Sequence, residues 1–450
     1  MLRTIKFMVL LWGLLACDGD DSSEGDSMGG RQAGDASAAA RQDFANAPVS
    51  ADGGPDAATA ADVAMATDTD TASGTDCGLA GCGRAVVSTG GRVDLLFVVD
   101  DSGSMSEEQA ALALEFPRLM QKLTSGDHDQ DGVAEYAPVE DLHLGVVSTN
   151  LGAGGSAVTS SCSEGGDSGR LLSRSSDSAA CNGDYPTFLS YLADGGDPEQ
   201  TAQDFACLAV LGTRGCGYEQ PLESALKALW PSADPSIRFM GNSIDEQLGR
   251  GDRENAGFLR NDPNEPAATL AIVVVSDEDD CSAYDPWLWT AEHFLLPEDP
   301  RVMQPLNLRC FYNPDRLHPI ERYLHGYRGL HGLTGARVLF AAIVGVPVDL
   351  VDQPALAAVD WGDEAQREAH YQLILDDPRM QEREDTDLPE GEPANLVPSC
   401  ESEQGKAYPP RRIVELARRF GPNSLVQSIC GDNLGPPIDL IVRNVVETPQ

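Results

Sequence analysis

Positive charge is scarce in this chain of 450 residues. Lysine and arginine together number 31, whereas aspartate and glutamate number 72, and the formal net charge is −41. Proteins that bind DNA or RNA through its phosphates need clustered lysine and arginine, so this composition argues against a nucleic-acid partner. A strongly acidic protein instead stays soluble and attracts cations.

The N-terminal apolar run, FMVLLWGLLA, is short, and it follows a charged n-region. A run of this length is too short for a permanent transmembrane helix and is typical of a signal peptide. Its end, Leu14-Leu15-Ala16-Cys17, resembles the lipobox of bacterial lipoproteins. We therefore predict a signal peptide over residues 1–17, with Cys17 lipidated. This implies a location in the cell envelope, anchored by lipid to a bacterial membrane and facing the periplasm or the exterior.

Large apolar residues are nearly missing from residues 18–76, which read as Asp, Ala, Gly, Ser and Thr, for example in TDTDTASGTD. Such a segment cannot bury enough apolar surface to offset the entropy lost on ordering. We expect a disordered acidic tether between the lipid anchor and the rest of the chain.

The cysteines show no paired CxxC pattern, which argues against a structural zinc site. There are 11 cysteines, so lipidation of Cys17 leaves an even 10 for disulfides in an exported protein. Sequence does not fix the pairing. Local spacing favours Cys77–Cys82, Cys162–Cys181, Cys207–Cys216, Cys281–Cys310 and Cys400–Cys430.

From residue 77 onward, apolar runs alternate with amphipathic segments, which indicates an α/β fold with a largely parallel sheet flanked by helices. We expect strands at Val93–Val99, Leu142–Ser148, Thr269–Ser276 and Val338–Val344. We expect helices at Glu107–Leu123, Pro198–Leu211, Glu219–Leu229, Leu317–His325, Arg411–Phe420 and Ile438–Val446. One domain over 77–450 follows, with a core at about 92–347, inserted loops and a helical C-terminal extension.

The first of these strands runs into Asp100, Ser102 and Ser104. Ligands bind at the carboxyl ends of parallel strands, where loops converge. Three oxygens at a spacing of two residues, on a turn that Gly103 allows to bend, suit a hard divalent cation. The alternative is that Asp100 and Ser102 only cap the following helix.

The stretch FVVDDSGSM resembles the first motif of the von Willebrand factor A domain, the D-x-S-x-S of its metal-ion-dependent adhesion site. That family has a second aspartate after a later apolar strand, and VVVSDEDD provides Ser276-Asp277. The resemblance implies a doubly wound, mostly parallel sheet. It also implies Mg²⁺ or Mn²⁺ at Asp100, Ser102, Ser104 and Asp277.

The family also contributes a threonine from a middle loop, and here the sequence departs from the pattern. The expected position falls near Glu219 or Gln220, before a helix that contains Ala225-Leu226, and the nearest threonine is Thr213. Either Thr213 reaches the metal or Glu219 replaces it. A third carboxylate would neutralise the ion further and weaken its attraction for an acidic ligand.

The function that the resemblance implies is binding, not catalysis: the metal takes an acidic side chain from a protein ligand. Two alternatives stay open. One is a structural envelope protein with a degenerate metal site. The other is a hydrolase in which Asp279 or Asp280 serves as a general base beside the metal.

A separate acidic loop, DHDQDG, places Asp127, Asp129 and Asp131 at the spacing of the first half of an EF-hand calcium loop. Its twelfth position is Pro138, so the usual glutamate is missing, with Glu135 or Glu140 as the nearest substitute. The loop is either a structural Ca²⁺ site or a solvated turn.

Overall fold

The computed structural model describes residues 87–88, 91–154, 162, 165–174, 181, 183–262, 264–290, 295–389, 391–403 and 405–448. The predicted signal peptide with Cys17, the tether over 18–76 and the pair Cys77–Cys82 lie outside these residues. Among the described residues, no helix combines the length and the apolar character that crossing a membrane requires.

A six-stranded sheet forms the centre of the fold, in the order β4-β3-β2-β5-β6-β9. All neighbouring strands are parallel except β4, which runs antiparallel to β3 at one edge. The mostly parallel sheet is therefore confirmed. Its strands are β2 (Arg92–Val99), β3 (Asp141–Ser148), β4 (Leu189–Leu192), β5 (Thr269–Val275), β6 (Arg337–Val344) and β9 (Ser424–Ser428).

The continuous apolar run in β2 is explained by helices on both faces of the sheet. Leu95 and Phe97 belong to the core on one face, whereas Leu96 and Val98 belong to the core on the other. Because successive side chains of a strand point to opposite faces, a strand covered on both sides needs apolar residues at every position.

Ten α-helices occur in the described residues. Those at the predicted positions differ from the predicted ranges mainly at their ends. α9 has the predicted bounds, whereas α5 starts at Ile320 because Pro319 precedes it. They are α1 (Ser106–Ser125), α2 (Pro198–Ala209), α3 (Pro221–Leu229), α4 (Arg309–Tyr312), α5 (Ile320–Thr334), α6 (Val348–Val351), α7 (Gln353–Ala357), α8 (Glu364–Asp376), α9 (Arg411–Phe420) and α10 (Gly435–Val446).

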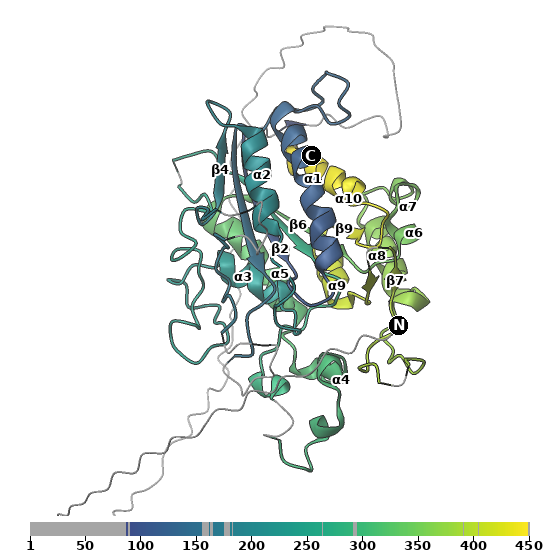
Figure 1. Cartoon of the computed structure of the whole chain (residues 1–450). Helices are drawn as coiled ribbons and strands as arrows, with labels where there is room; N and C mark the ends of the chain where they lie inside the picture. Colours follow the sequence, from purple (N-terminus) through teal and green to yellow (C-terminus); the bar gives the residue numbers. More distant parts are fainter. Residues whose placement is uncertain are drawn as a thin grey trace, which may run out of the picture. The chain divides into compact units, whose positions relative to one another are not determined.

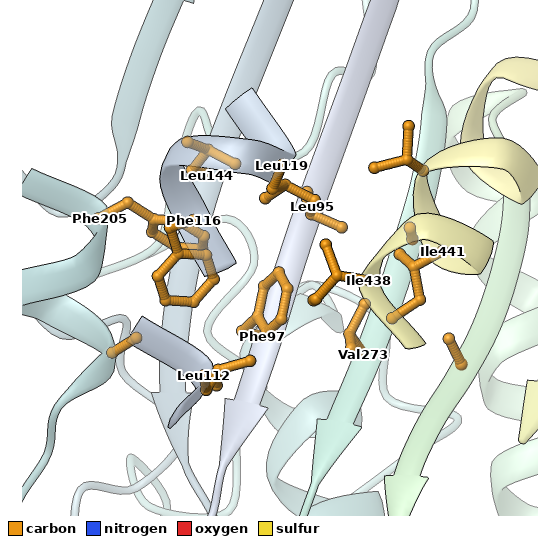
Figure 2. Packing of buried hydrophobic residues seen from close by; sticks show 14 of the residues in the cluster. Leu95, Phe97, Leu112, Phe116, Leu119, Leu144, Phe205, Val273, Ile438 and Ile441 are labelled. Carbon is orange, nitrogen blue, oxygen red and sulfur yellow. The ribbon is translucent and has the colours of Figure 1, made fainter. Parts of the chain in front are cut away.

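The helices cover the two faces of the sheet in separate groups (Figure 1). One face packs against α1, α2 and α10, and Figure 2 shows Phe97 there beside Phe116 and Phe205. The ring centroids of these three residues lie 4.3–5.4 Å apart, within the range of favourable aromatic contacts. The other face packs against α3, α5, α8 and α9.

The sheet extends beyond the predicted core of about 92–347, because its last strand, β9, lies in the C-terminal extension. This extension contains α8, α9 and α10, as the prediction of helices there implied, but β9 was not predicted. Its sequence, SLVQS, is short and carries the buried Gln427, so it lacks the apolar run by which the other parallel strands were recognised.

Two small antiparallel pairs complete the strands of the described residues. β1 (Val87–Ser88) pairs with β10 (Glu447–Thr448), which joins the start of the described chain to its end. β7 (Cys400–Glu401) pairs with β8 (Lys406–Ala407) just before α9.

The disulfides correct two of the predicted pairs. Cys281–Cys310 and Cys400–Cys430 form as predicted, but Cys162–Cys181 and Cys207–Cys216 do not. The observed pairs are Cys162–Cys216 and Cys181–Cys207. Local spacing misled because the end of β3 and the segment before α3 lie side by side, where Gln220 N donates to Thr149 O at 3.1 Å. Cysteines distant in sequence therefore meet.

Candidate metal site at the carboxyl ends of β2 and β5

The predicted metal ligands lie where two central, adjacent strands end. β2 ends at Val99, whose partner in β5 is Val275, so Asp100 and Ser276 follow as neighbours. The backbone of Asp100 is fixed there, since its N–H donates to Val275 O at 3.0 Å. The parallel register thus brings the two quoted motifs, 176 residues apart, to one point.

The Asp100 carboxylate is held in one orientation by its neighbours. Ser102 N donates to one oxygen at 2.8 Å, and the Ser276 hydroxyl donates to the other at 2.6 Å. Asp100 is fully buried, and this burial raises its pKa while the two hydrogen bonds oppose the rise. The hydroxyls of Ser102 and Ser104 lie 3.3 Å apart, and Ser104 is exposed to solvent.

Asp277 is the carboxylate at this edge whose burial is least offset by hydrogen bonds. It is fully buried, and neither of its side-chain oxygens has a hydrogen-bond partner among the described residues. Burial raises its pKa well above the ordinary value, and the charges of Asp100 and Glu278 raise it further, against a smaller effect from Ser104. Its backbone is fixed, because Tyr408 N donates to Asp277 O at 2.7 Å.

The middle loop, which precedes α3, places the carboxylate of Glu219 at this edge of the sheet. Glu219 is 1% exposed and its Oε1 has no hydrogen-bond partner among the described residues, whereas Thr213 is exposed. Burial raises the pKa of Glu219 well above the ordinary value, followed by the charges of Glu278 and Asp100. The hydrogen bond from Cys281 N to Glu219 O, at 2.8 Å, ties this loop to the segment after β5. Of the two open alternatives, the geometry therefore favours Glu219.

Three further acids border the site and were not predicted. The pKa of Glu278 is raised to about 7, mainly by burial, with a hydrogen bond to Glu219 opposing. The pKa of Asp101 is also raised to about 7, by burial and then by Asp100 and Asp167. Glu108, on α1, is buried with Oε2 unpartnered. Its sequence signal was an acid in the first turn of the helix that follows the motif.

The two carboxylates considered for a hydrolase have structural roles. Asp279 accepts from the N–H groups of Arg412 and Ile413 and so caps α9. Asp280 accepts from Leu222 N at 3.1 Å and pairs with the Arg412 guanidinium at 3.1 Å. These bonds join the first turns of α3 and α9 to the loop after β5.

The predicted calcium loop also brings its acids together. Oxygens of Asp127, Asp129, Asp131 and Glu135 all lie within 4.8 Å of one another. Glu135, not Glu140, is the further acid in this cluster, and its carboxylate also accepts from His128 N at 2.5 Å. Around Asp100, no group of three carboxylates among the described residues comes this close together.

If the loop holds calcium, Ca²⁺ should raise the melting temperature of the wild-type protein by about 1–2 °C for each kcal/mol of binding energy. Asp129→Ala should lose this rise, because the remaining three carboxylates bind the ion weakly. Asp194→Ala, which removes an exposed aspartate elsewhere, is the control. Equal calcium-dependent shifts in Asp129→Ala and wild type would identify the loop as a solvated turn.

A scan against models of protein families finds no match to this chain, and no curated protein matches it.

Proposed function

We propose that the chain is an envelope lipoprotein whose domain resembles the von Willebrand factor A domain and binds a protein ligand through a divalent cation. Asp100, Ser102, Ser104 and Asp277 hold Mg²⁺ or Mn²⁺, with Glu219 beside them. The observation that carries the proposal is Asp277, a fully buried carboxylate whose two side-chain oxygens make no well-formed hydrogen bond among the described residues and only a weak interaction with the Ser104 hydroxyl.

The donor set fits a hard cation. It consists of carboxylate and hydroxyl oxygens, the ligands that Mg²⁺ and Mn²⁺ prefer. Burying an unpaired carboxylate is costly, and carboxylates converge here without a basic side chain among the main influences on Asp277, Glu219 and Glu278. A bound divalent cation supplies the missing positive charge and an attraction for an acidic side chain of a partner.

The fold and the position of the site support the resemblance. The sheet is mostly parallel and has helices on both faces, and both motifs follow central strands at their carboxyl ends. Ser104 is exposed while Asp100 and Asp277 are buried, so the site opens to solvent on the side of Ser104. A ligand from a partner has access from that side.

The segment after β5 supports a protein as the partner. It carries Trp287 at 63% and Met303 at 86% exposure, besides other large apolar side chains on its surface. Cys281–Cys310 closes this segment, and Trp289 stacks on Tyr218, the residue before Glu219. Exposed apolar side chains on a braced loop beside a binding site are typical of protein contact surfaces.

The proposed location also has structural support. Four disulfides are present in the described residues, and disulfides form in oxidising compartments outside the cytosol. Lipidation of Cys17 provides the anchor in this proposal. Palmitate labelling that is lost in Cys17→Ser tests this part by itself.

Glu219 favours a second candidate function, a structural envelope protein that keeps a cation for stability alone. A third carboxylate next to Asp100 and Asp277 leaves less positive charge to attract a partner. Binding of a partner, and not of the cation, separates the two functions.

Calorimetric titration of the oxidised full-length protein with Mg²⁺ and Mn²⁺ tests the cation site. We expect one saturable site in the wild type and none at these residues in Asp100→Ala or Asp277→Ala. Asp439→Asn removes a carboxylate that pairs with Arg118 and Lys122 on α1 and serves as the control with normal uptake. Wild-type affinity in both site variants would refute the assignment.

Selection from a library of random displayed peptides in Mn²⁺, with elution by EDTA, tests the partner's chemistry. We expect the selected peptides to share an aspartate or glutamate whose replacement by asparagine or glutamine abolishes binding. Peptides that bind equally in EDTA, or a protein that binds Mn²⁺ but selects none, would favour the structural function.

A further inference from the structure

Thr149 has an unexplained hydroxyl at the same edge of the sheet. It follows β3 directly, it is fully buried, and its Oγ1 makes no hydrogen bond among the described residues. An unsatisfied buried hydroxyl costs about 1–3 kcal/mol, so a threonine at such a position needs a reason.

The register places this hydroxyl beside Asp100. Val98 pairs with Val147 in β3 and with Val274 in β5, and all three side chains lie in the core on the α3 face. Two residues further on, side chains return to the same face, so Thr149, Asp100 and Ser276 are neighbours across three strand ends. Thr149 N donates to Val99 O at 3.2 Å, which continues the pairing to this position.

The side chain of Ser276 is already committed to Asp100, whereas that of Thr149 is not. The backbone of Thr149 also faces the middle loop, since its carbonyl accepts from Gln220 N at 3.1 Å. Glu219, with its own unpartnered Oε1, is the residue before Gln220. The amide of Gln220 donates to Gly152 O at 2.9 Å, which directs that side chain to the loop after β3.

We propose that Thr149 supplies the neutral oxygen that the middle loop lacks, as a ligand of the cation on the β3 side of Asp100. This inference rests on the proposed cation site. A hydroxyl adds a donor without adding negative charge, so it completes the site while leaving positive charge for an acidic partner. Glu219 and Thr149 together then perform what a single middle-loop threonine does in the family that the sequence resembles.

The test is Mn²⁺ titration of oxidised full-length Thr149→Val and Thr149→Ser. We expect valine, which keeps the shape but lacks the hydroxyl, to weaken Mn²⁺ binding by about 10-fold or more, and serine to stay within about 3-fold of wild type. The melting temperature in EDTA should not fall for valine, because no hydrogen bond is lost. Thr149→Ala replaces valine in the test if that variant does not fold.

The matched control is Thr290→Val. Thr290 is also fully buried, and its hydroxyl has no hydrogen-bond partner among the described residues, but it lies in the segment after β5, so its removal should leave Mn²⁺ affinity unchanged. If Asp100→Ala loses Mn²⁺ while Thr149→Val binds as wild type, the assignment of Thr149 is wrong and the proposed function stands. If wild type takes up no Mn²⁺, both are wrong.

Discussion

Asp277→Asn is expected to stabilise the metal-free protein and, at the same time, to abolish the stabilisation that Mn²⁺ or Mg²⁺ gives. The variant keeps the shape of the side chain, and asparagine needs no proton, whereas burial and the charges of Asp100 and Glu278 raise the pKa of Asp277 so far that its carboxyl must take up a proton on folding at neutral pH. Removing this cost should raise the free energy of unfolding in EDTA at pH 7 by about 1–3 kcal/mol.

With the cation present, the order of stability should reverse. A cation at 100 times its dissociation constant stabilises the wild type by about 2.7 kcal/mol, whereas the variant gains nothing from it. Urea unfolding with EDTA and with Mn²⁺ measures both effects on one pair of proteins. A variant that is less stable than wild type in EDTA would show that Asp277 has a structural partner, and would remove the main support for the cation site.

The metal-free protein should lose stability as the pH rises from 6.5 to 8. Burial raises the pKa of Asp101 and Glu278 to about 7 and those of Asp277 and Glu219 well above their ordinary values. The folded state therefore binds protons that the unfolded chain releases near pH 4. The stabilisation by these protons is complete below that pH and is lost as the pH rises through the folded-state pKa values.

Asp101 and Glu278 alone should account for a loss of about 1.5 kcal/mol over this window, since each pKa unit corresponds to about 1.4 kcal/mol, and Asp277 and Glu219 should add to it. Four partly buried histidines have lowered pKa values and act in the opposite sense, but chiefly below pH 6.5, which sets the lower limit of the window. Saturating Mn²⁺ should reduce the dependence of stability on pH, because the bound cation takes the place of the protons on these carboxylates. A metal-free stability that is constant or rises between pH 6.5 and 8 would contradict the prediction.

The strands that could be predicted from the sequence are those whose residue pattern has a single physical cause, which is burial on both faces of the sheet. The strands β2, β5 and β6 are apolar at nearly every position because helices cover both faces, and that pattern can be recognised without a structure. β4 and β9 were missed, since four or five residues at or near a sheet edge need no long apolar run. Their positions depend on contacts from distant segments.

The site was predictable where it is local in sequence and not where it depends on the register between strands. Asp100, Ser102 and Ser104 lie on one turn, and Asp277 was found because it too ends an apolar strand. Thr149 also follows an apolar run, in LGVVSTN, but its nearness to Asp100 becomes apparent only from the pairing of β2 with β3. The choice of Glu219 over Thr213 likewise depends on burial, which spacing does not reveal.

The small pairing of β1 with β10 fixes where the preceding chain joins the domain, and this has a mechanical consequence. Val87–Ser88 lies just before the start of β2, and Asp100 lies just after its end. If a partner is held at Asp100 and the chain is pulled from its N-terminal side, the force runs lengthwise along β2 once β1 has peeled away from β10. β2 is bonded in parallel to β3 on one side and to β5 on the other, over eight and seven residue pairs. A lengthwise pull loads these hydrogen bonds in shear, so they resist together and do not open one after another, a geometry suited to holding under tension.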